Sequence, residues 1–105
     1  MKNLYDETLH VLEMNDKSFD DVVAIQNDTH AISIENFIEV AKKTNYDSDY
    51  GIAAVDTNLK VIGEDWWLER YEYDGAEWWV FKTLPRIKTN FKKIEKLVDD
   101  WSVDE

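Results

Sequence analysis

The sequence predicts an α+β fold, an antiparallel sheet of two or more hairpins with helices packed on one face. Apolar residues recur at helical spacing in three stretches, short β-branched and aromatic runs lie between them, and an Asp-Gly pair joins two aromatic runs. Helices on one face of an antiparallel sheet bury such amphipathic elements, so the expected order is about α-β-β-α-β-β-β-β-α. The 105 residues suit one compact domain, and we expect residues 1–105 to form a single acidic domain.

Two helices are expected in the first half of the chain. Apolar side chains recur near helical spacing from Leu4 to Leu12, and Asn15-Asp16 ends that pattern. Ser33 stands where an N-cap is needed, because an apolar helical stripe follows over residues 34–41. This second helix should end near Thr44, where residues that favour loops begin.

Strands are expected between and after these helices. The β-branched run 22–25 is followed by turn residues and predicts a strand, with residues 30–32 returning as its partner. Residues 52–55 and 59–62 flank a short polar turn and predict a second hairpin. The strongest local signal is Asp74-Gly75 between two aromatic runs, which is typical of a hairpin with a type I′ turn.

The register of the aromatic hairpin depends on the length of its turn. A two-residue turn places Tyr71 opposite Trp78, whereas a three-residue loop with a bulge places Arg70 opposite Trp78. The sequence leaves both registers open.

A third helix is expected after Pro85. Thr89 or Asn90 would cap it, and one apolar face would be formed by Phe91, Ile94, Leu97, Val98 and Trp101.

Charge is unevenly distributed along the chain, which carries 12 basic and 23 acidic side chains and a net charge of -11. Residues 1–81 hold 6 basic and 18 acidic side chains, whereas residues 82–96 hold 6 basic and 1 acidic. An acidic body therefore carries one short basic segment. Direct binding to nucleic acid is disfavoured, because phosphates repel such a surface.

No catalytic residue, metal site or cofactor is expected, so we predict that the protein is not an enzyme. It lacks cysteine, and its two histidines, His10 and His30, have no second ligand at metal-binding spacing. There is no glycine-rich phosphate loop. A weaker alternative is a hydrolase that uses Glu77 with Glu69 or Glu72 as paired carboxylates across the hairpin. No apolar run approaches a membrane span and no secretory h-region opens the chain, so we expect a cytoplasmic location in a bacterial host and no membrane contact.

Aromatic residues form one candidate contact surface. Neighbouring residues of a strand point to opposite faces, so each adjacent Trp pair contributes one ring to each face of the sheet. Trp and Tyr are enriched among interface hot spots. The rings on the uncovered face would therefore form a contact patch, unless loops or the last helix cover them. The predicted aromatic contact residues are Trp66, Trp67, Tyr71, Trp78 and Trp79.

Carboxylates form a second candidate surface, since they crowd the middle third of the chain. Fixed carboxylates on a rigid sheet can imitate the phosphates of a duplex and are steered to basic channels. The predicted acidic contact residues are Asp47, Asp49, Asp56, Glu64, Asp65, Glu69, Glu72, Asp74 and Glu77. The alternative is an acidic surface that only confers solubility.

The hairpin segment also carries a recognisable motif. Residues 67–82 read WLER-Y-EYDG-A-EWW-V-FK, and this string resembles a family of small proteins from phages and mobile elements of Gram-positive bacteria. The resemblance implies a mobile-element origin, and hence proteins that act on or against the host. It leads to the hypothesis of an inhibitor of a host defence enzyme, an RNA-guided nuclease or a restriction enzyme, that acts as a DNA mimic. The alternative is a structural or accessory phage protein that forms homo-oligomers through an aromatic sheet face.

Overall fold

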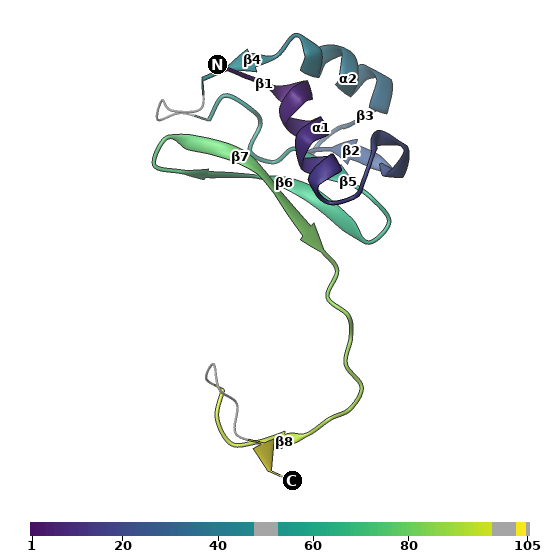
Figure 1. The fold of residues 1–105 in the computed structure, drawn as a ribbon, viewed down its shortest axis with the longest axis vertical. Helices are drawn as coiled ribbons and strands as arrows, with labels where there is room; N and C mark the ends of the chain where they lie inside the picture. Colours follow the sequence, from purple (N-terminus) through teal and green to yellow (C-terminus); the bar gives the residue numbers. More distant parts are fainter. Residues whose placement is uncertain (48–52, 98–102, 105) are drawn as a thin grey trace.

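The structure is a computed structural model and describes residues 1–47, 53–97 and 103–104. Two helices, α1 (Leu4–Met14) and α2 (Ile34–Lys42), lie side by side on one face of a sheet (Figure 1). A short 3₁₀ turn, Phe19–Asp21, leads from α1 into the sheet.

The sheet has five strands, all antiparallel, in the order β3-β2-β5-β6-β7. Its members are β2 (Ala24–Gln26), β3 (Ala31–Ile32), β5 (Lys60–Ile62), β6 (Trp66–Tyr73) and β7 (Ala76–Thr83). The predicted α+β class is confirmed, and the predicted order of elements is matched only roughly.

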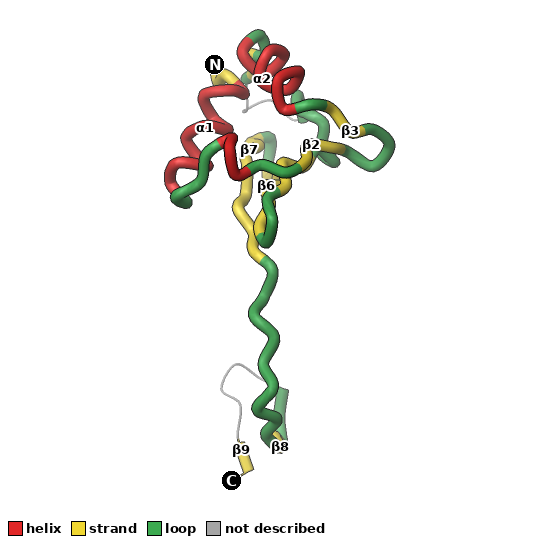
Figure 2. Tube along the Cα trace, turned by 90° about the vertical axis from the view of Figure 1, so that its right-hand side faces the viewer, coloured by secondary structure: helices red, strands yellow, loops and turns green. Residues whose placement is uncertain are grey.

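Two pairs of very short strands lie outside the main sheet. β1 (Lys2–Asn3) pairs with β4 (Asn45–Tyr46), which joins the start of α1 to the end of α2. β8 (Lys93–Ile94) pairs with β9 (Val103–Asp104) far from the body of the protein (Figure 2).

Both helices begin at capping side chains. Asn3 accepts a hydrogen bond from the backbone N–H of Asp6 at 3.1 Å and caps α1. Ser33 accepts one from the backbone N–H of Asn36 at 3.0 Å, so the predicted cap of α2 is confirmed.

The core lies between the helices and the inner face of the sheet. Alternate residues of each strand point inward, so β6 and β7 contribute large side chains that pack against α1. The buried apolar residues are Leu4, Leu12, Val22, Ile25, Phe37, Ala41, Tyr46, Val55, Val61, Trp66, Leu68 and Trp79.

The aromatic hairpin has the two-residue turn. Asp74 and Gly75 have φ angles of 51° and 87°, the positive values that a type I′ turn requires. Tyr71 consequently lies opposite Trp78. Of the two registers that the sequence left open, this is the one without a bulge.

The predicted hairpin of residues 52–55 and 59–62 is wrong where the structure describes it. Residues 53–55 form no strand, and β5 pairs instead with β2 and β6. The predicted partner strand begins at Ile52, which lies outside the described residues. The loop 53–55 is held by a side chain of β7, described below.

The third helix is not found over residues 84–97. This segment leaves the sheet after β7 and runs away from the body (Figures 1 and 2). Isolated amphipathic helices of this length are marginal in water, because most of their stability comes from packing of the apolar face. Val98 and Trp101, also assigned to this helix, lie outside the described residues. None of the described helices is long and apolar enough to span a membrane.

Candidate functional site

A buried polar cluster lies between the inner face of the hairpin and α1, with Arg70 at its centre. The Nη2 atom of Arg70 donates to Glu77 Oε2 at 3.0 Å and to the Tyr46 hydroxyl at 3.1 Å. Its Nη1 atom lies 3.4 Å from the Glu7 carboxylate. The guanidinium carbon also lies 4.8 Å from the centre of the Trp79 ring. Four elements are thereby joined through one buried cation.

Glu77 fixes a loop as well as Arg70. Its carboxylate accepts the backbone N–H groups of Ala54 at 2.7 Å and Val55 at 3.2 Å. Burial alone would raise the pKa of Glu77, but these hydrogen bonds and the Arg70 guanidinium lower it overall. The carboxylate therefore stays ionised, which makes it a poor general acid.

Tyr46 completes the cluster from β4. Its hydroxyl donates to the Glu7 carboxylate and accepts from Arg70. Burial and the hydrogen bond to Glu7 raise the pKa of Tyr46 to about 12. The pKa of Arg70 is also raised: burial opposes its charge, but Tyr46, Glu7 and Glu77 together favour it.

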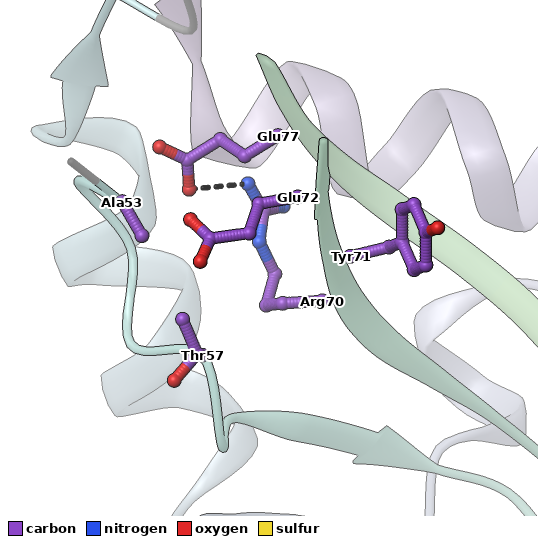
Figure 3. A pocket seen from close by; sticks show the side chains of 6 residues that line it. All are labelled: Ala53, Thr57, Arg70, Tyr71, Glu72 and Glu77. Carbon is purple, nitrogen blue, oxygen red and sulfur yellow. Dashed lines mark hydrogen bonds and ion pairs between the residues drawn. The ribbon is translucent and has the colours of Figure 1, made fainter. Parts of the chain in front are cut away.

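A small pocket of about 150 Å³ opens beside this cluster (Figure 3). Glu72 and Glu77 line it with Arg70, whereas the ring of Tyr71 lies on the other side of the strand. The two carboxylates face each other across the hairpin, but Glu77 is committed to Arg70 and to the loop. The geometry thus does not favour the paired-carboxylate hydrolase.

Two of the predicted aromatic contact residues belong to the core. Trp66 and Trp79 are almost fully buried, and the Nε1 of Trp79 donates to Thr8 Oγ1 at 2.8 Å. These rings point inward because their positions alternate with the outward-facing ones. We therefore correct their assignment, since neither ring is available to a partner in this structure.

The other three predicted aromatic residues share the face of the sheet opposite the helices. We define the open face as this outward surface, whose apolar residues are Ile62, Trp67, Tyr71, Trp78 and Val80 and whose charged residues are Lys60, Glu69 and Lys82. The rings of Tyr71 and Trp78 lie 5.2 Å apart, and Tyr71 is 52% exposed. A shallow depression of about 270 Å³ adjoins Trp67 and Ile62.

The predicted acidic residues are divided among several environments. Glu77 is buried, which removes it from any acidic contact surface. Glu69 lies on the open face but is partly covered; it accepts from Trp67 Nε1 at 2.6 Å and pairs with Lys82 at 3.3 Å. These hydrogen bonds, with that of Trp67 the largest influence, lower the pKa of Glu69. Asp49 lies outside the described residues. The predicted acidic residues whose side chains are exposed are Asp47, Asp56, Glu64, Asp65, Glu72 and Asp74.

Some of the exposed carboxylates flank the open face. Glu64 and Asp65 stand at the turn before β6, and Asp74 stands at the hairpin turn, so the hairpin has carboxylates at both ends. Glu72 points to the opposite side, toward the pocket beside Arg70. Asp56 lies apart from these, where a hydrogen bond from Asn27 and the backbone N–H of Asn58 lower its pKa.

Sequence reasoning missed the partners of Arg70. Glu7 and Tyr46 lie far from the hairpin in sequence, and neither belongs to a motif. One signal was present: Arg70 occupies an inward position between Leu68 and the turn, where an unpaired cation is costly.

Within the described residues, no group of three or more histidine or carboxylate side chains is arranged to hold a metal ion. No family model, no curated protein and no solved structure matches this chain.

Proposed function

We propose that this protein is a non-catalytic binding protein that occupies the basic nucleic-acid channel of a host enzyme through the open face. One observation carries the proposal: Trp67, Tyr71 and Trp78 share the face that the helices leave uncovered, and the rings of Tyr71 and Trp78 lie side by side there. Rigid strands hold these rings, so little entropy is lost when a partner covers them.

The aromatic residues supply the contact area of this surface. Tyr and Trp bury large areas with few rotatable bonds and are enriched among interface hot spots. The depression beside Trp67 offers a place for an apolar or long aliphatic side chain of the partner. We expect these rings to determine how slowly the complex dissociates.

The charge of the protein supplies the preference for a basic partner. The acidic body sets up a negative field, and the carboxylates of Glu64, Asp65 and Asp74 flank the open face, whereas Glu69 on that face is paired with Lys82. Such a field accelerates association with a positively charged channel and repels nucleic acid itself. Glu77 is not part of this surface, because it is buried with Arg70.

The motif over residues 67–82 suggests which partners to test. A phage or mobile-element origin favours an anti-CRISPR or anti-restriction role in the cytoplasm of a bacterial host. RNA-guided nucleases and restriction enzymes hold DNA in positively charged channels. Inhibition would result from mimicry of the duplex, without any reaction catalysed by this protein.

The experiment is competition between labelled DNA and this protein on a purified RNA-guided nuclease and a purified restriction enzyme, at two salt concentrations. The triple variant Glu64→Gln, Asp65→Asn, Asp74→Asn should compete at least about tenfold less well than wild type at low salt. The matched control is Glu35→Gln, Glu39→Gln, Glu72→Gln, which removes as many exposed carboxylates away from the open face. Absence of competition on every enzyme tested would overturn the proposal.

The second candidate is a phage accessory protein that self-associates through the same face. The uncovered rings favour it, because large apolar surfaces on a monomer tend to be interfaces. Two open faces packed together would make a stable oligomer that does not compete with DNA. Light scattering, which measures the oligomeric state, distinguishes the two functions when it is combined with the competition assay.

A further inference from the structure

A basic segment with exposed apolar side chains follows the hairpin. We define the arm as residues 84–97, which extend away from the body (Figure 2). Ile87 is 85% exposed and Phe91 is 94% exposed, and Leu84 and Leu97 are also exposed. Isolated exposed apolar residues are ordinary, but a row of four on one extended segment indicates a docking sequence.

The arm also differs from the body in charge. It holds five basic side chains and one acidic one, whereas residues 1–81 hold 6 basic and 18 acidic side chains. Basic apolar segments are attracted to acidic apolar surfaces, both by the long-range field and by burial on contact. The open face holds three aromatic rings, with Glu64 and Asp65 at one end and Asp74 at the other, and its two lysines, Lys60 and Lys82, flank Glu69.

The arm leaves the body on the side of the sheet that the helices do not cover and extends outward from it (Figures 1 and 2). The backbone N–H of Leu84 donates to the carbonyl of Asp65 at 2.9 Å, which anchors the base of the arm at the end of the hairpin. Beyond that bond the chain continues outward from the sheet (Figure 1). Because the arm extends outward and does not lie along its own sheet, it can reach the open face of another molecule (Figure 1).

The spacing of the apolar residues shows how the arm would present them. Ile87, Phe91 and Ile94 are separated by three or four residues, so a helix that begins after Pro85 would place these three side chains on one side. A free helix of this length is marginal, and docking supplies the packing that stabilises it. The arm is not helical here, and Lys93–Ile94 form β8, so docking as a helix would replace the pairing of β8 with β9.

We infer that the arm of one copy docks as a helix on the open face of a second copy, with Ile87 and Phe91 against Trp67 and Trp78. The inference rests on the proposed function in one respect, that the open face is a binding surface. It adds a regulatory property, because a copy whose open face holds an arm cannot use that face for a basic partner. Association of copies would then lower the concentration of free inhibitor.

The test compares full-length variants by analytical ultracentrifugation and circular dichroism over a range of concentrations. Wild type should associate as concentration rises, with a parallel gain in helical signal. Two double variants should each weaken association at least tenfold. The arm variant combines Ile87→Ser with Phe91→Ser, and the open-face variant combines Trp67→Ser with Trp78→Ser. The matched control is Val23→Ser, Val40→Ser, which changes two exposed apolar residues of the body.

Mixing the two double variants identifies the contact. The arm variant keeps an intact open face and the open-face variant keeps an intact arm, so an equimolar mixture should recover one of the two contacts and form a heterodimer. Three results would overturn the inference: a monomeric wild type at all concentrations, an arm variant that associates like wild type, or a mixture that stays monomeric. The second of these results would indicate face-to-face packing instead.

The arm variant also separates this inference from the proposed function. If the arm does not dock but the open-face variant loses competition with DNA, only the inference fails. If the arm docks but no enzyme is inhibited, the proposed function fails and self-association remains. If both hold, the arm variant should compete with DNA better than wild type at high protein concentration, because more open faces are free.

Discussion

Arg70 and Glu77 form an ion pair of 3.0 Å across two neighbouring strands, and both side chains are buried. Glu77 also binds two backbone N–H groups of the loop 53–55, while Arg70 reaches Glu7 on α1. The pair therefore connects the hairpin to a helix on one side and to a loop on the other. The open face lies on the other side of the same two strands.

Loss of the Glu77 charge should destabilise the fold. We expect Glu77→Gln to lower the free energy of unfolding by about 3 kcal/mol, because it leaves the buried Arg70 cation undercompensated. Urea denaturation at neutral pH measures the change. Glu72→Gln, which alters the exposed residue opposite, is the control and should stay within about 0.5 kcal/mol of wild type. Equal losses in the two variants would contradict the assignment of Glu77 to the buried cluster.

The lowered pKa of Glu77 also predicts that the free energy of unfolding falls in acid. A carboxyl whose pKa is lower when folded stabilises the protein above its ordinary pKa of 4.5, and this contribution disappears as pH falls below it. The difference in free energy of unfolding between wild type and Glu77→Gln should therefore become smaller as the pH is lowered. A gap that stays constant from pH 7 down to pH 3 would contradict the lowered pKa.

The raised pKa of Tyr46 predicts that the protein also loses stability at alkaline pH. Its pKa rises from 10.0 to about 12 on folding, so the neutral hydroxyl stabilises the protein below pH 10 and this contribution is lost as pH approaches 12. Tyr46→Phe should cost about 1 kcal/mol at neutral pH and should lack this alkaline loss. Urea titrations at pH 8, 10 and 11 provide the comparison. Parallel curves for the two proteins across that range would show that Tyr46 does not titrate in this way.

The hairpin turn predicts a strong dependence on residue 75. Gly75 has a φ of 87°, which strains a β-branched side chain, so Gly75→Val should lower stability by more than about 1 kcal/mol. Asp74→Asn is the control, because Asn accepts the φ of 51° found at residue 74 and Asn-Gly favours the same turn. Thermal unfolding measures both, and equal melting temperatures for Gly75→Val and wild type would contradict the turn geometry.

The parts of the fold that were predictable depend on neighbours in sequence. The cap at Ser33 and the turn at Asp74-Gly75 are local, so their residues alone were sufficient. The pairing of β5 with β2 joins segments more than thirty residues apart and was missed, because short apolar runs do not specify their partners. The predicted third helix failed for a related reason: its apolar stripe is present, but nothing in residues 84–97 shows what it packs against.

The candidate site was predictable only in part. Strand alternation correctly required one ring of each Trp pair on each face, but it did not tell which face the helices cover. The cluster around Arg70 draws Glu7, Tyr46 and Glu77 from three other elements. Such long-range convergence leaves no spacing pattern in a single sequence, and Glu77 was consequently assigned to the surface.

The most direct test of the open face as the contact surface is a dissociation constant. It is measured between the full-length protein and a purified RNA-guided nuclease or restriction enzyme on which the protein competes with DNA. We expect Tyr71→Ser, Trp78→Ser to weaken this binding at least about tenfold, mainly through faster dissociation, because truncated hot spots each cost about 2 kcal/mol. Val40→Ser, an exposed change on α2, should leave the constant unchanged. Equal dissociation constants for wild type and a folded Tyr71→Ser, Trp78→Ser variant would contradict the open face as the contact surface.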